Sequence, residues 1–91
     1  MLKNENYIDD IYKRITEEEQ CIVSIGYKCG TITTRGLIEI FEFDNGNLFF
    51  NIGQFNVEFE DCKEICMEYT FDGIMYIFKF FDIQIYMMFL D

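Results

Sequence analysis

Four cysteines are the residues whose spacing most directly suggests chemistry. Seven residues separate Cys21 from Cys29, and three separate Cys62 from Cys66. Structural zinc sites usually pair ligands across two to four residues at a tight turn, so only the second pair has a fitting spacing. A disulfide needs an oxidising compartment, and residues 1–6 lack the apolar run of a signal peptide. We expect reduced, buried or half-buried thiols, with a metal site or a disulfide as the alternatives.

Catalytic chemistry has few candidates. The chain has no His and a single Ser, Ser24. This excludes His-based triads, His general bases and His-ligated metals, and nothing is left to activate a Ser or Cys nucleophile. Carboxylate pairs such as Glu58 and Glu60, or Glu39 and Glu68, would need one member with a pKa raised by burial. Glu58 and Glu60 alternate with apolar residues and should face water, so we expect no enzyme activity, no metal and no cofactor.

Charge is distributed unevenly along the chain. Residues 1–35 hold six acids and five bases, whereas residues 36–91 hold eleven acids and two bases, within a total net charge of −10. So few bases argue against direct nucleic-acid binding, while fixed carboxylates attract basic partners. The alternative is that acidity only keeps an aromatic-rich domain in solution. The predicted partner-binding patch consists of Glu58, Glu60, Asp61, Glu64 and Glu68.

Hydrophobic periodicity predicts one domain over residues 1–91, with a helix at 4–19 and β structure at 21–91. Ile8, Ile11 and Ile15 lie on one helical stripe, and from Cys21 the apolar period changes to two. A 51% hydrophobic and 19% aromatic composition excludes a disordered acidic tail. The strands are expected at 21–27, 31–43 with a bulge or bend at Gly36, 48–52, 55–60, 65–71, 74–81 and 83–90, with hairpin turns at 44–47 and 72–73.

This pattern places the chain in the mainly β (α+β) class. One N-terminal helix should precede a five- to seven-stranded antiparallel meander, curled into a small SH3/Sm-like barrel or a strongly bent sheet. The segments 36–40, 48–52 and 57–65 resemble the YolD-like and Sm-like small β-barrels, and the likeness covers residues 8–65. The resemblance implies a helix before bent strands with Gly at a bend. The chain departs from these families by an added hairpin at 66–91 and by lacking the basic loop residues of RNA-binding members.

The C-terminal hairpin is apolar on both of its faces, apart from Lys79. A strand that is apolar on both faces is usually covered on both. We therefore expect a homodimer or higher oligomer, with barrel closure around a packed interior as the alternative. The predicted oligomer contact consists of Tyr76, Phe78, Phe81, Tyr86 and Met88.

Together these features predict a small, acidic, non-enzymatic, cytoplasmic protein that binds a basic protein partner, such as a nuclease or another nucleic-acid-binding protein, and acts as an inhibitor. In composition the chain resembles anti-CRISPR and other anti-defence inhibitors of phages or mobile elements, and immunity proteins that neutralise nucleases. The alternative is an oligomeric structural or accessory Sm-like barrel domain that works through its C-terminal aromatic hairpin. We expect no direct nucleic-acid contact and no membrane contact, because Lys79 and Asp82 interrupt the most apolar stretch at 74–90.

Overall fold

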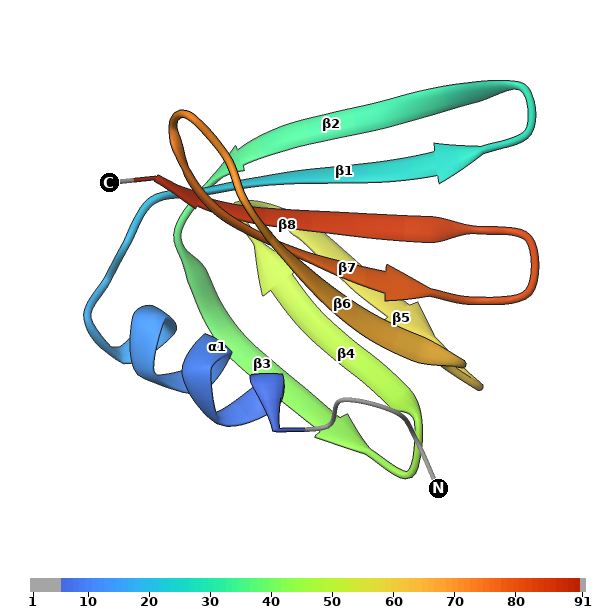
Figure 1. Ribbon diagram of the computed structural model, residues 1–91, viewed down its shortest axis with the longest axis horizontal. Helices are drawn as coiled ribbons and strands as arrows, with labels where there is room; N and C mark the ends of the chain where they lie inside the picture. Colours follow the sequence, from blue (N-terminus) through green and yellow to red (C-terminus); the bar gives the residue numbers. More distant parts are fainter. Residues whose placement is uncertain (1–5, 91) are drawn as a thin grey trace.

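The two apolar periods of the sequence produce one helix and eight strands within residues 6–90, the part of the chain that the computed structural model describes (Figure 1). The helix predicted at 4–19 begins at Tyr7 and ends at Thr16, before the acidic run at 17–19, where carboxylates oppose the helix dipole. Residues 4–5 of that prediction lie outside the described part of the chain. The elements are α1 (Tyr7–Thr16), β1 (Cys21–Tyr27), β2 (Gly30–Gly36), β3 (Ile38–Asp44), β4 (Asn47–Ile52), β5 (Phe55–Phe59), β6 (Glu64–Tyr69), β7 (Gly73–Lys79) and β8 (Gln84–Leu90).

The single strand expected at 31–43 is in fact two strands that belong to different sheets. Gly36 ends β2 and pairs with Cys21, whereas Ile38 begins β3 and pairs with Ile52. The bend expected at Gly36 is therefore a corner at which the chain leaves one sheet for the other. This division is one reason why the count is eight strands and the prediction of five to seven was too low.

The strands form two antiparallel sheets rather than one closed barrel. The larger sheet has the order β2-β1-β8-β7-β6, and the smaller has the order β3-β4-β5. The last strand, β8, pairs with the first strand, β1, so the β region begins and ends inside one sheet. Of the two predicted arrangements, a barrel or a strongly bent sheet, the closed barrel is not found. Within residues 6–90 no hydrogen-bonded strand pairing joins the two sheets, and the chain crosses between them at Leu37 and at 60–63. The expectation of a mainly β fold after one helix is confirmed.

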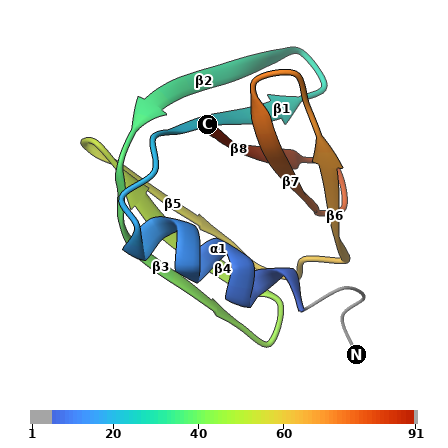
Figure 2. The same cartoon turned by 60° about the vertical axis from the view of Figure 1, so that its left-hand side comes forward.

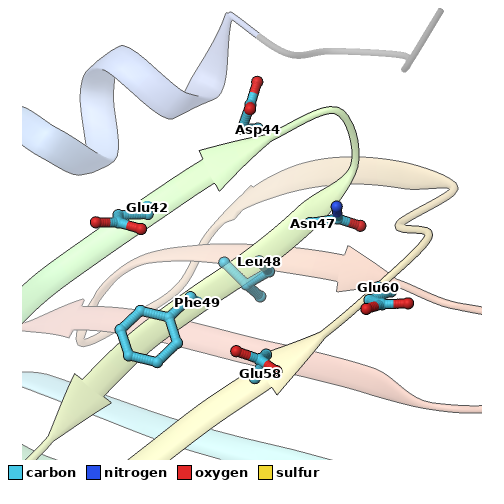
Figure 3. A pocket seen from close by; sticks show the side chains of 7 residues that line it. All are labelled: Glu42, Asp44, Asn47, Leu48, Phe49, Glu58 and Glu60. Atoms are coloured by element: carbon cyan, nitrogen blue, oxygen red, sulfur yellow. The ribbon is translucent and has the colours of Figure 1, made fainter.

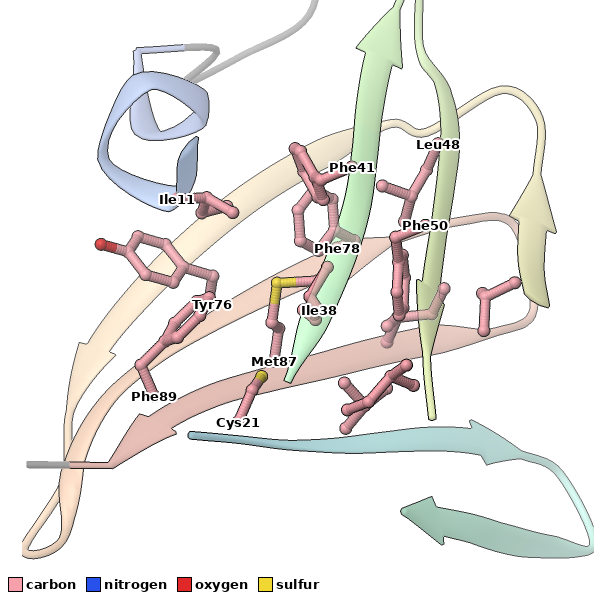
Figure 4. Packing of buried hydrophobic residues seen from close by; sticks show 14 of the residues in the cluster. Ile11, Cys21, Ile38, Phe41, Leu48, Phe50, Tyr76, Phe78, Met87 and Phe89 are labelled. Atoms are coloured by element: carbon pink, nitrogen blue, oxygen red, sulfur yellow. The ribbon is translucent and has the colours of Figure 1, made fainter. Parts of the chain in front are cut away.

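A shared core lies between the two sheets and beneath the helix (Figure 4). Phe41 of β3 contacts Phe78 of β7 with ring centroids 6.3 Å apart, which links the sheets. The rings of Tyr12 in α1 and Phe41 pack edge to face with their centroids 5.1 Å apart, and α1 packs against both β3 and β6 (Figure 2). The most deeply buried side chains are those of Ile11, Cys21, Val23, Leu48, Phe50, Ile52, Ile65, Tyr76, Phe78, Ile85, Met87 and Phe89.

Tyr76 also ties α1 to the larger sheet. The Nε of Arg14 donates a hydrogen bond to the Tyr76 hydroxyl at 3.3 Å, and Arg14 forms an ion pair with Glu19 at 3.0 Å. Burial raises the pKa of Tyr76 even though the hydrogen bond from Arg14 lowers it. The buried hydroxyl is therefore neutral and has a partner, as a stable core requires.

The turn between β3 and β4 has the geometry that its sequence predicts. Asn45 and Gly46 both have positive φ, at 51° and 80°, the conformation of a type I′ hairpin turn. The Gly46 carbonyl accepts a hydrogen bond from the Cys62 amide at 2.8 Å. This bond fastens the segment at 60–63 to the smaller sheet just before the chain returns to the larger one.

Gly73 permits a close approach of backbone segments at the start of β7. A Cβ atom at this position would lie 2.0 Å from the Phe89 carbonyl oxygen, a backbone atom that cannot swing away. We expect Gly73→Ala to lower the free energy of unfolding by about 2 kcal/mol or more, measured by urea denaturation. Gly30→Ala is the control, because no atom lies within 4 Å of a Cβ at Gly30. A Gly73→Ala midpoint equal to that of Gly30→Ala would contradict the prediction.

Candidate functional site

The outward face of the smaller sheet gathers carboxylates from two of its strands and from the end of β5. Alternation turns Phe41, Leu48 and Val57 toward the core and turns their neighbours along the strands outward. The carboxylates on this face are all exposed, and Figure 3 shows the strands from which their side chains come. We call this surface the acidic face, and its carboxylates belong to Glu42, Asp44, Glu58 and Glu60.

Strand register fixes the geometry of the acidic face. Glu42 of β3 lies opposite Phe49 of β4, and Phe49 lies opposite Glu58 of β5. Glu42 and Glu58 therefore flank one aromatic side chain, and their backbones are about 10 Å apart. Asp44 lies opposite Asn47 in the next row. Together with Glu60 these residues line a shallow hollow of about 300 Å³.

No ion pair within residues 6–90 neutralises the acidic face. The ion pairs of this part of the chain join Arg14 to Glu19, Lys63 to Asp61 and Lys79 to Glu64. The four carboxylates therefore hold unneutralised like charge on a rigid support, which creates a negative potential around Phe49.

The predicted acidic patch is divided between the two sheets. Glu58 and Glu60 belong to the acidic face, whereas Glu64 and Glu68 lie on β6 of the larger sheet. Asp61 lies in the crossing segment, where it binds Lys63 at 2.7 Å. The grouping into one patch was therefore incorrect, because the chain changes sheets between Glu60 and Glu64.

Glu64 and Glu68 also differ in their surroundings. Glu64 is half-buried, with an oxygen 3.8 Å from the Lys79 ammonium nitrogen. Glu68 is exposed near the outer edge of the larger sheet. Neither side chain lines the hollow of the acidic face.

Sequence reasoning missed Glu42 and Asp44 as members of the acidic face. Both alternate with inward-facing Phe residues, and they precede the Asn45-Gly46 turn that folds β3 against β4. The turn contained the signal that could have identified them. A two-residue turn sets which residues of the two strands lie opposite each other, so it places Glu42 and Asp44 beside the outward residues of β4.

The predicted oligomer contact is likewise divided. Tyr76 and Phe78 are 0% exposed and belong to the core, so their assignment to a subunit contact was incorrect. Phe81 is 91% exposed in the turn between β7 and β8. Tyr86 and Met88 are half-buried on the outward side of β8. The alternation of β7 explains the error, because each strand buries one face only against the other sheet.

Two smaller features complete the surface. A largely apolar hollow of about 150 Å³ opens between the edges of β2 and β5, beside Ile32 and Phe55. Ser24 shares a hydrogen bond of 3.1 Å with Thr33 and is therefore already partnered. The helix of residues 6–90, α1, lacks the length and the apolar composition that a helix needs to cross a membrane.

The cysteines are separated in the fold. Cys21 and Cys62 are buried, Cys66 is half-buried and Cys29 is exposed, and all four are free thiols. Burial raises the pKa of Cys21 to about 12 and that of Cys62 to about 11. Among the described residues, no group of three or more Cys, Asp, Glu or His side chains is arranged to hold a metal ion.

Comparison with known protein families, curated proteins and solved structures gives no match. The resemblance to YolD-like and Sm-like barrels therefore stays a prediction.

The thiols should differ strongly in reactivity, because the thiolate is the species that reacts with alkylating reagents. In the native protein at pH 8, we expect a maleimide to label Cys29 first and Cys66 more slowly. Cys21 and Cys62 should react roughly 100-fold more slowly than Cys29, since they need both opening of the core and deprotonation. Mass spectrometry of peptides from timed samples measures the four rates.

Unfolding in urea provides the control, because all four thiols should then react at similar rates. Cys29→Ser should remove the fastest phase of native labelling. Native labelling of Cys21 at the rate of Cys29 would contradict the burial that raises the pKa of the Cys21 thiol.

Proposed function

We propose that this protein is a non-enzymatic, protein-binding inhibitor whose acidic face occupies the basic, nucleic-acid-binding surface of its partner. The observation that carries the proposal is the clustering of Glu42, Asp44, Glu58 and Glu60 on one outward sheet face without a paired base in the described chain. A surface that binds phosphates uses clustered Lys and Arg, and rows of carboxylates on a rigid sheet present complementary charge to it.

The arrangement supports a recognition surface better than it supports acidity for solubility alone. Solubility needs only dispersed charge, whereas this sheet holds its carboxylates on two strands around one half-buried aromatic side chain, Phe49. Like charges held close together repel one another, so the arrangement costs stability that a basic partner would recover on binding. Phe49 adds an apolar contact at the centre of the face, where aromatic side chains contribute most to binding.

The state of the nucleophilic side chains supports a binding role. The chain has no His, and Ser24 is bonded to Thr33. Burial keeps the Cys21 and Cys62 thiols protonated at neutral pH by raising the pKa of each. A likeness in composition to anti-CRISPR and immunity proteins supports the same class of function.

The decisive variant reverses charge on both sides of Phe49. We expect Glu42→Lys/Glu58→Lys to weaken partner binding at least tenfold, because it replaces two attractive contacts by repulsive ones. Partner candidates are captured from native cells on the immobilised chain. Each purified candidate is then tested in a competition binding assay with labelled double-stranded DNA, at salt concentrations from about 50 to 200 mM.

A matched control carries the same change in charge away from the acidic face. Glu17→Lys/Glu18→Lys alters two exposed acids that follow α1, and it should compete with DNA as strongly as the unaltered chain. The proposal fails if no captured protein is displaced from DNA. It also fails if the acidic-face variant and the control compete equally well.

The second candidate function is an oligomeric accessory domain. The observation that favours it is a set of apolar side chains on the outward face of the larger sheet, including Tyr86 and Met88.

A further inference from the structure

The larger sheet has an apolar outward face that the core does not explain. Tyr76 and Phe78 of β7 point into the core. Because side chains alternate along a strand, Ile77 between them and Met75 before them point outward. Ile77 is only 7% exposed, although it is not part of the core cluster that includes its neighbours. Its neighbours across the strands on this face are Cys66 of β6 and Tyr86 of β8.

Strand register assembles these outward side chains into adjacent rows. In one row, Ile22 of β1 lies opposite Met88 of β8, which lies opposite Met75 of β7. In the next row, Tyr86 lies opposite Ile77. We call this surface the dimer face, and its apolar centre consists of Ile22, Met75, Ile77, Tyr86 and Met88.

No other element of residues 6–90 covers the dimer face. The core, α1 and the smaller sheet all lie on the other side of the larger sheet, against its inward face (Figure 2). Isolated apolar side chains on a surface need no partner. The side chains of the dimer face instead lie in adjacent rows, and all but the buried Ile77 are half-buried, so together they leave a continuous apolar surface in contact with solvent.

Complementary charges lie at the two ends of the same row. Arg35 of the edge strand β2 lies opposite Ile22, and Glu68 of the other edge strand, β6, lies opposite Met75. Four strand spacings separate Arg35 from Glu68, about 19 Å, so they cannot pair within one chain. Both are exposed, and neither forms an ion pair within the described residues.

We propose that the occupant of the dimer face is a second copy of this chain, packed face to face about a two-fold axis parallel to the central strand β8. This axis reverses the strand order, so β2 of one protomer lies over β6 of its partner. Arg35 then meets the partner's Glu68, and the symmetry makes the same contact twice. The apolar rows of the two sheets pack on each other between these contacts.

Charge also rejects the other two-fold arrangement. A two-fold axis in the plane of the interface but perpendicular to the strands would place β6 over the partner's β6, with the two strands running in opposite directions. The row that contains Glu68 would then lie over the partner's row that contains Glu64, which brings these two carboxylates together. This juxtaposes like charges, whereas the axis parallel to β8 juxtaposes opposite charges. The register of Arg35 and Glu68 therefore selects a single arrangement.

The size and net charge of the dimer face suit a weak but specific dimer. Sheet spacings give one face an area of about 500 Å², so a dimer would bury about 1,000 Å² in total, near the lower limit for a specific interface. Two bases, Arg35 and Lys79, balance two acids, Glu64 and Glu68, on the outward side. The unpaired carboxylates lie on the other sheet, so dimerisation does not bring them together and does not depend on the proposed inhibitor function.

The test compares the dimer dissociation constants of the unaltered chain and of variants in which the charges at Arg35 and Glu68 are reversed. Sedimentation equilibrium of the full chain from about 1 to 300 µM measures these constants in the micromolar range. The unaltered chain should dimerise within this range. Arg35→Glu and Glu68→Arg should each weaken the dimer at least tenfold, because each places like charges together twice. The double variant Arg35→Glu/Glu68→Arg should restore the dissociation constant to within about threefold, by exchanging the partners of each contact.

Two further variants separate interface effects from folding effects. Met88→Lys at the centre of the dimer face should abolish dimerisation, whereas Ile40→Lys changes a side chain that is 47% exposed on the smaller sheet and should leave it unchanged. Circular dichroism and urea midpoints verify that each variant is folded. A monomeric unaltered chain, a double variant as weak as the single variants, or a dimer unaffected by Met88→Lys would overturn the proposal.

Discussion

The burial of one aromatic core between two sheets is the constraint on which the other features depend. Phe41 from the smaller sheet meets Phe78 from the larger sheet, and Tyr12 of the helix completes the contact. Because side chains alternate along a strand, each core position determines that its neighbours face outward. The two surfaces for which we propose functions are therefore direct consequences of core packing: an acidic outward face on one sheet and an apolar outward face on the other.

Local structure was predictable where a single strand and its turn carry the signal. The strand at 21–27 was predicted with the observed bounds, and the strand predicted at 55–60 ends one residue earlier, at Phe59. Asn45-Gly46 forms the expected hairpin turn. The pairing of β1 with β8 was not predictable, because it joins segments about sixty residues apart and no local preference encodes such a partner. The corner at Gly36 was predicted as a bend inside one strand for the same reason. A bend within one strand and a corner between two strands differ only in the partner strands on either side, which the local sequence does not reveal.

The candidate site was predictable in kind but only partly in membership. Glu58 and Glu60 were identified by alternation, whereas Glu64 and Glu68 were grouped with them by proximity in sequence alone. Proximity failed because the chain changes sheets between these pairs. On the C-terminal hairpin, periodicity showed that both faces are apolar, but it could not show that Tyr76 lies inward and Tyr86 outward. That choice depends on which face meets the other sheet, a property of the assembled core.

The two outward surfaces point away from each other, and this geometry constrains how they act together. In the proposed dimer the larger sheets meet at the centre and the two acidic faces lie at opposite ends. One compact partner with a single basic surface can then contact only one acidic face, so dimerisation adds no contact to that complex. A partner with two basic surfaces far apart could engage both ends, and its affinity would then gain from effective concentration. In these two proposals, dimerisation would therefore change the number of partners bound by each assembly, while the acidic face of each protomer would set the affinity for each partner.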